Sequence, residues 1–165
     1  MKSAMIFSSN MAEQKRFTVV ELPDLKWPTS LQLPSRRFRL FVAADISDVS
    51  VHAVSEFASA ALDRGMVYFC AWGRDCERFH DIVDEVVVQD GLGERRFVGP
   101  TASDTVMTTW HEHESLNEAL AFFTGSAIPT QGFAADSSFR LVICIGNPDW
   151  ADTASHVLQS TEFFI

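Results

Sequence analysis

The chain has 165 residues, of which 47% are hydrophobic and 21% charged, so it can fold as one domain with a sizeable core and is too apolar for a disordered chain. Its 13 basic and 22 acidic residues give a net charge of −9, which argues against nucleic-acid binding and suits either a solvated acidic surface or a basic protein partner. Three cysteines are too few for a disulfide framework, and no apolar run reaches the roughly 18 to 20 residues of a membrane span, so we expect a cytoplasmic protein without a membrane partner.

Residues 1–35 are predicted to form an N-terminal extension, and residues 36–165 a single α/β domain. Three prolines between positions 23 and 34 exclude a long helix or a central strand there, whereas Phe17–Leu22 has the β-branched composition of a short strand. Residues 1–15 are expected to be a loose terminal segment. A glycine-rich loop is predicted over 90–104, and the apolar tail 163–165 is expected to pack or to pair at a sheet edge.

The sequence alternates four apolar strands with four amphipathic helices. The predicted strands are Phe38–Ala44, Val67–Ala71, Thr105–Trp110 and Phe139–Ile145. The predicted helices are Val51–Leu62, Cys76–Val87, Leu116–Phe123 and Pro148–Leu158. Strand–helix units of this kind build parallel sheets. We therefore expect a three-layer Rossmann-like or flavodoxin-like domain, with a mostly parallel sheet of about four to five strands and helices on both faces.

Turn and capping residues support these helix boundaries. Gly65 ends the first helix as a left-handed C-terminal cap would, and the Asp75 carboxylate is expected to cap the second. Ser115 and Glu118 have the spacing of a capping box, and Asn147 precedes a proline at the first position of the last helix.

Polar and aromatic residues follow the ends of all four predicted strands. Ligands of open α/β sheets bind at the carboxyl ends of the strands. The residues expected there as a ligand or partner surface are Trp72, Arg74, Asp75, Trp110, Asn147 and Trp150. Three of the four tryptophans belong to this set, which favours an aromatic platform for a ligand or a partner. The alternative is that these tryptophans close the end of the core.

Nucleotide-binding signatures are missing from the sequence. No G-x-G-x-x-G follows the first strand and no G-x-x-x-x-G-K-[ST] occurs, while acidic residues at the helix starts would repel phosphate. We therefore expect no cofactor. The acidic pair Asp81 and Asp84 lies on one helix face, where paired carboxylates are usually solvated.

Cys76 is the candidate nucleophile for the enzyme alternative. It lies in the first turn of a predicted helix, where the helix dipole lowers the pKa of a thiol, although Asp75 beside it acts in the opposite direction. His111 from the next strand end would be its base, with Asp45 or Glu112 orienting the imidazole. This set would suit a hydrolase or a transferase.

Zinc binding is a further alternative. Cys76 and His80 are four residues apart on one helix, and His111 and His113 are two apart in an extended segment. Four such ligands suit zinc, but their spacing matches no established zinc pattern, so no metal is expected.

Two segments of the chain, Ala71–Cys76 and Met107–Leu116, resemble a family of small uncharacterised bacterial proteins. That family carries an A-W-G-x-D-C segment and a T-T-W-H-E-x-E-x-L segment, and the resemblance covers roughly residues 38–147. The positions that match its motifs are Trp72, Cys76, Asp84, Trp110, His111 and Glu112. His80 and His113 stand where the family pattern has acidic residues, which counts against zinc. The resemblance implies a bacterial protein and brings no established activity.

The function that we expect is binding of a partner, as in an immunity or accessory protein of bacteria, by a monomer or a homodimer. The alternative is the hydrolase or transferase with Cys76 and His111. We also expect Trp72, Trp110 and His111 to lie close together at the carboxyl edge of the sheet, with Trp110 packed and the more polar His111 facing solvent.

Overall fold

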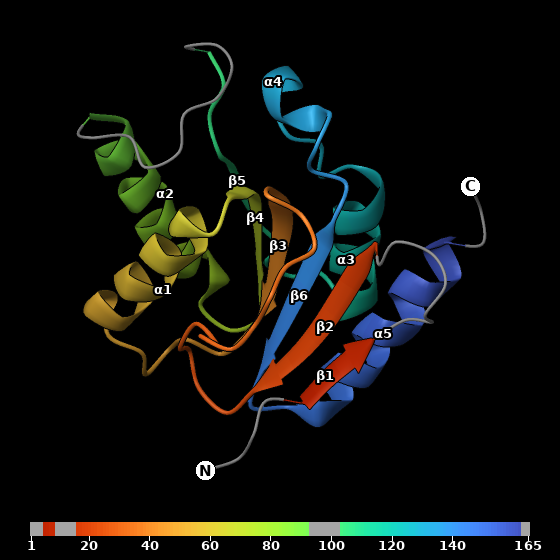
Figure 1. The fold of residues 1–165 in the computed structure, drawn as a ribbon. Helices are drawn as coiled ribbons and strands as arrows, with labels where there is room; N and C mark the ends of the chain where they lie inside the picture. Colours follow the sequence, from red (N-terminus) through yellow and green to blue (C-terminus); the bar gives the residue numbers. More distant parts are fainter. Residues whose placement is uncertain (1–4, 9–15, 93–102, 163–165) are drawn as a thin grey trace.

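The structure is a computed structural model that describes residues 5–8, 16–92 and 103–162. Its centre is a six-stranded sheet with the order β1-β2-β6-β3-β4-β5. The five strands from β2 to β5 in this order are parallel, and β1 runs antiparallel to β2 at one edge (Figure 1). The predicted α/β architecture with a mostly parallel sheet is confirmed. The predicted tail 163–165 and most of the predicted loop over 90–104 lie outside the described residues.

The elements follow the predicted alternation closely. The strands are β1 (Met5–Ser8), β2 (Phe17–Leu22), β3 (Phe38–Ala43), β4 (Met66–Trp72), β5 (Met107–Trp110) and β6 (Arg140–Ile145). The helices are α1 (Val51–Asp63), α2 (Cys76–Leu92), α3 (Leu116–Gly125), α4 (Gln131–Ala134) and α5 (Pro148–Glu162). Strand β1 and the short helix α4 were not predicted, and a loose terminal segment was expected where β1 lies.

Two hydrophobic clusters cover the two faces of the sheet. Helices α1 and α2 pack on one face, and α3 and α5 pack on the other (Figure 1). Because β3, β4 and β6 are covered on both sides, most of their side chains are buried, as their nearly continuous apolar sequences predict. The domain therefore has the three layers expected from the sequence.

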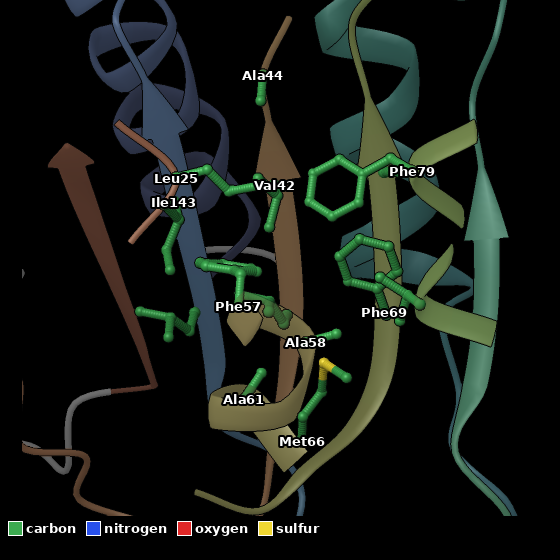
Figure 2. Packing of buried hydrophobic residues seen from close by; sticks show 14 of the residues in the cluster. Leu25, Val42, Ala44, Phe57, Ala58, Ala61, Met66, Phe69, Phe79 and Ile143 are labelled. Atoms are coloured by element: carbon green, nitrogen blue, oxygen red, sulfur yellow. The ribbon is translucent and has the colours of Figure 1, made fainter. Parts of the chain in front are cut away.

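Aromatic rings fill the cluster beneath α1 and α2. The ring of Phe79 from α2 lies 5.0 Å from that of Phe69 in β4, and Figure 2 shows both beside the side chains of α1. Trp27 packs against Phe57 at 5.7 Å and Phe38 at 6.0 Å. The proline-containing segment that precedes β3 is thus held on the core by its tryptophan.

Strand β2 is an integral part of the sheet. It pairs with β6 along its whole length, from Phe17 opposite Arg140 to Leu22 opposite Ile145. Val19 and Val20 point to opposite faces and are both fully buried. The short strand predicted over these residues therefore contributes to both hydrophobic clusters.

Most of the predicted helix caps are present. The capping box of Ser115 and Glu118 starts α3, and Asn147 Oδ1 accepts a hydrogen bond of 3.0 Å from the Asp149 backbone N–H. Asp75 differs from the prediction, because its φ of 64° is left-handed and its carboxylate faces Arg78 Nη1 at 3.5 Å.

Gly73 makes the sharp exit from β4 possible. Its φ is +116°, and a Cβ atom there would lie 2.1 Å from the carbonyl oxygen of Ala44. Replacing Gly73 with alanine should lower the free energy of unfolding by about 1 to 3 kcal/mol, because the residue would keep a strained conformation and clash with backbone. Denaturant unfolding would measure this loss.

Gly91 provides the matched control. A Cβ atom at this position in α2 meets nothing within 4 Å, so Gly91→Ala should leave stability unchanged or raise it by up to about 1 kcal/mol. Equal stability of the Gly73 and Gly91 variants would contradict the role given to Gly73.

Candidate functional site

Residues that follow β3, β4, β5 and β6 border an open crevice at the carboxyl edge of the sheet. Parallel strands bring these residues together, and the crevice has a volume of about 330 Å³. Six of the residues that were predicted for a site line it: Asp45, Trp72, Arg74, His111, Glu112 and Trp150. Gly73, His113 and Glu114 complete the lining. The structure thus gathers most of the predicted positions around one crevice, while Cys76, Asp75, Trp110 and Asn147 lie outside its lining.

Two other hollows of the described surface lie elsewhere. One of about 330 Å³ separates the second half of α2 from the start of β5, and one of about 400 Å³ lies between α1 and the segment around Trp27. Neither is at the carboxyl ends of the strands, where open α/β sheets bind their ligands. The crevice is therefore the candidate site.

Trp72 and Trp150 form one wall of the crevice. Their ring centroids are 5.3 Å apart and their planes are nearly perpendicular, at 88°. The indole N–H of Trp72 donates a hydrogen bond of 2.9 Å to the carbonyl oxygen of Glu114, which fixes the ring against the loop that follows β5. The predicted clustering of tryptophans at the strand ends is thus present for this pair, although no strand ends at Trp150, which lies in the first turn of α5.

His111 lines the crevice and is itself almost fully buried. Only 5% of its surface is exposed, and its ring lies 4.6 Å from that of Phe122 in α3. Its Nδ1 is 3.0 Å from Glu114 Oε2, and its Nε2 is 3.1 Å from Thr109 Oγ1, which in turn donates to Cys70 Sγ at 3.4 Å. The expectation that His111 would be the solvent-facing residue was wrong, because α3 covers the face of β5 to which His111 points.

Trp110 lies on the opposite face of β5. Its ring packs against His80 of α2 at 4.5 Å, and 43% of its surface remains exposed. His80 Nε2 is also 3.0 Å from Thr108 Oγ1, which donates to Asp84. The predicted alternation between positions 110 and 111 is correct, but the buried and exposed roles are reversed. Trp110 is accordingly not beside Trp72 in the crevice.

Cys76 does not have the environment of a nucleophile. Its side chain is 2% exposed and belongs to the cluster beneath α1 and α2. Burial raises the pKa of its thiol, and the charge of Glu112 raises it further, while hydrogen bonds from backbone N–H groups, that of His111 among them, oppose the shift. The sequence offered two opposing effects on this pKa, the helix dipole and the charge of Asp75, and in the structure loss of hydration outweighs the dipole.

The imidazole of His111 is not the partner of the Cys76 thiol in this geometry. The backbone N–H of His111 donates to the carbonyl oxygen of Ala71, and the ring points to the α3 side of the sheet, where Thr109 and Glu114 engage both of its nitrogens. Asp45 does not orient the ring either, since its carboxylate accepts hydrogen bonds from the backbone and side chain of Ser47. These two hydrogen bonds lower the pKa of Asp45, so it stays ionised well into the acid range.

The four residues of the zinc alternative do not converge. His80 is engaged with Thr108 and Asp81, whereas the side chain of His113 is 89% exposed. In the part of the chain that the structure describes, no group of three or more histidine, cysteine, aspartate or glutamate side chains is placed to hold a metal ion.

Glu114 lines the candidate site and Thr109 supports it; neither is among the predicted site residues, although Thr109 was expected at this strand end. Glu114 contributes both its carbonyl, to Trp72, and its carboxylate, to His111. Glu114 gave no usable signal in the sequence, because its contact with His111 depends on the turn that the structure shows over residues 111–114. Thr109 carried a weak signal, two residues before His111 on the same face of the strand.

The geometry therefore defines an α/β domain with a tryptophan-walled, carboxylate-rimmed crevice at the strand ends. The chain belongs to the family described as a domain of unknown function (DUF7684), whose model matches residues 17–161. The predicted membership in an uncharacterised family is confirmed. No curated protein and no solved structure matches the chain significantly. Among the described residues, no helix has both the length and the apolar character required to cross a membrane.

Substitutions at positions 110 and 111 test this assignment of the two faces. His111→Ala should lower the free energy of unfolding by about 2 to 4 kcal/mol, because it empties a buried site and removes a partner from Thr109 and Glu114. Trp110→Ala should cost only about 1 kcal/mol, since its ring is half-exposed at a sheet edge. Thermal or denaturant unfolding would rank them, and a larger loss for Trp110→Ala would contradict the assignment.

Thiol reactivity tests the environment of the three cysteines. All three are buried, and burial raises the pKa of Cys70 and Cys144 to about 12. The folded protein should therefore not react with Ellman's reagent at about pH 8, because the reactive thiolate is not formed there. Unfolding in guanidinium chloride should release all three thiols. Rapid labelling of Cys76 in the folded protein would instead restore the nucleophile hypothesis.

Proposed function

We propose that the protein is a small cytoplasmic protein of bacteria, of the immunity or accessory class, that binds a basic partner protein as a monomer or homodimer and performs no catalysis. The observation that supports this proposal is the concentration of exposed carboxylates around the tryptophan-walled crevice. The exposed carboxylates that follow the strands are Asp45, Asp48, Asp75, Glu112, Glu114 and Asp149. Asp24 and Lys26, which follow β2 on the same edge, are also exposed and cancel each other in charge, and Arg74 and Arg78 are the other basic residues there. The edge therefore carries excess negative charge, which attracts a basic surface.

Positive charge gathers at the opposite edge of the sheet. Of the 13 basic residues, six precede or begin a parallel strand: Arg16, Arg36, Arg37, Arg39, Arg64 and Arg140. Several of them have structural partners, since Arg37 pairs with Asp136 at 3.0 Å and Arg39 donates to the carbonyl oxygens of Ser137 and Ala127. This separation of charge would turn the carboxyl edge toward an approaching basic partner, which favours one orientation of binding.

The crevice also has the aromatic residues that binding hot spots use. Tryptophan contributes most at interfaces when it is anchored and partly exposed, and the N–H of Trp72 is anchored on Glu114. The enzyme alternative has weaker support, because the Cys76 thiol is buried with a raised pKa and the His111 ring lies on the other face of the sheet.

Charge reversal at the crevice tests the proposal. The chain, used as bait in an extract of its native host, should retain a protein of high isoelectric point, and the association rate of the purified pair should fall as salt increases. Glu112→Lys should weaken this binding by about tenfold or more, since a rim carboxylate is replaced by a like charge. Surface plasmon resonance would measure both effects.

Glu85→Lys is the matched control for this experiment. Glu85 is exposed on α2, away from the strand ends, and its replacement makes the same change in net charge. If both variants weaken binding equally, the effect comes from the net charge of the protein and not from the crevice. The absence of any basic partner from such extracts would overturn the proposal.

A further inference from the structure

The tryptophan wall of the crevice suits a cation. The rings of Trp72 and Trp150 meet edge to face at 88°, and both line the hollow. Tryptophan attracts cations over its ring face more strongly than the other aromatic residues do. The hydrogen bond from Trp72 to Glu114 holds this geometry before any ligand arrives.

The charged side chains that line the crevice also favour a cation over an anion. Asp45, Glu112 and Glu114 line the crevice with carboxylates, and Arg74 is the one arginine or lysine of the described lining. Glu114 is held in place by the buried His111 through Oε2, while its Oε1 has no hydrogen-bond partner among the described residues. A fixed carboxylate with a free oxygen beside two indole rings offers a cation both a charged hydrogen bond and a cation–π contact.

Anionic ligands do not fit this crevice. The start of α3, which borders it, is capped by its own residues, since Ser115 Oγ accepts from the Glu118 N–H and Glu118 accepts from the Ser115 N–H. At the start of α5, Asn147 accepts from the Asp149 N–H. The helix N-termini thus offer little to a phosphate or carboxylate, which the surrounding acidic side chains would also repel.

From this geometry we propose that the crevice binds one organic cation, the guanidinium or ammonium group of an arginine or lysine side chain that projects from the partner protein. The volume of about 330 Å³ lies at the lower end of the range for small-ligand sites, which suits a single side chain. This proposal rests on the proposed function for the carrier of the cation. The cation site itself can be tested with model compounds and no partner.

The four indole N–H resonances of the protein provide the readout. N-acetyl-arginine amide and N-acetyl-lysine amide should shift the resonances of Trp72 and Trp150 saturably in a nitrogen–proton correlation spectrum. Trp110, which is exposed on the other face of the sheet, should not shift and serves as an internal control for unspecific stacking. N-acetyl-citrulline amide, the uncharged analogue of the arginine probe, should shift none of them. Tryptophan-to-phenylalanine variants would assign the four signals.

Two variants with opposite expected effects test the charge of the site. Glu114→Gln should weaken binding of the arginine probe by about tenfold, because the amide keeps the shape and loses the charge. Arg74→Ala should strengthen binding by about threefold, because it removes the competing cation from the lining. Glu85→Gln, a change of the same kind on α2, should leave the affinity unchanged.

The outcomes distinguish this site from the proposed function. Equal shifts with citrulline, an equal shift of Trp110, or no shift at Trp72 and Trp150 would overturn the cation site, even if a basic partner binds elsewhere. Saturable binding of the arginine probe that Glu114→Gln weakens and Glu85→Gln preserves would support it. If the probe binds in this way but host extracts contain no basic partner, the cation site is supported and the proposed function is overturned. In that case the cation does not come from a partner protein.

Discussion

The parallel pairing of β2, β6, β3, β4 and β5 is the constraint on which the rest of the structure depends. It places five strand ends on one edge, so residues that are far apart in the sequence, such as Asp45, Trp72 and Trp150, line one crevice. The pairing requires cover on both faces, which two helices on each side provide. Burial of the sheet and assembly of the crevice therefore have the same cause.

The pleat of β5 then directs alternate side chains of the strand to two different environments, the buried face under α3 and the face toward α2 and solvent. Thr109 and His111 point to α3 and join a buried hydrogen-bonded chain from Glu114 to Cys70, whereas Thr108 and Trp110 point to α2 and the solvent. A shift of one residue in register would exchange these sets. The buried chain holds the carboxylate of Glu114 at the crevice, so His111 acts on the site through another residue.

Much of the fold could be predicted from the sequence, because its signals are local. The apolar runs of β3, β4 and β6 and the capping box at Ser115 depend on neighbouring residues only. The burial of His111 could not be predicted, because it depends on which face of β5 is covered by α3, a helix that follows it in the chain. Polarity alone suggested that His111 would be exposed and Trp110 buried, since histidine is more often solvent-exposed than tryptophan.

The sequence predicted most of the residues that line the candidate site, but not the environment of Cys76 and His111. Tryptophans at strand ends and nearby carboxylates are visible in the sequence, and most of them do line the crevice. The net shift of the thiol pKa of Cys76 could not be predicted, because the sequence shows the helix start and the neighbouring Asp75 but not the degree of burial. A helix dipole is worth roughly 0.3 to 1 kcal/mol near the surface, whereas one pKa unit corresponds to about 1.4 kcal/mol and full burial shifts a pKa by several units.

Two residues near the crevice adopt conformations that favour glycine. Asp75 has a φ of 64° and His113 a φ of 62°, and each lies within three residues of a strand end. Such conformations in non-glycine residues cost about 1 to 2 kcal/mol each and persist only where the surroundings fix them. Around His113 the fixing contacts are those of its neighbours, since His111 is buried and the carbonyl of Glu114 accepts from Trp72. The left-handed residue lies in the same turn as Glu114, whose carbonyl accepts from the indole of Trp72 and whose carboxylate meets His111, so the turn and the wall of the crevice belong to one segment.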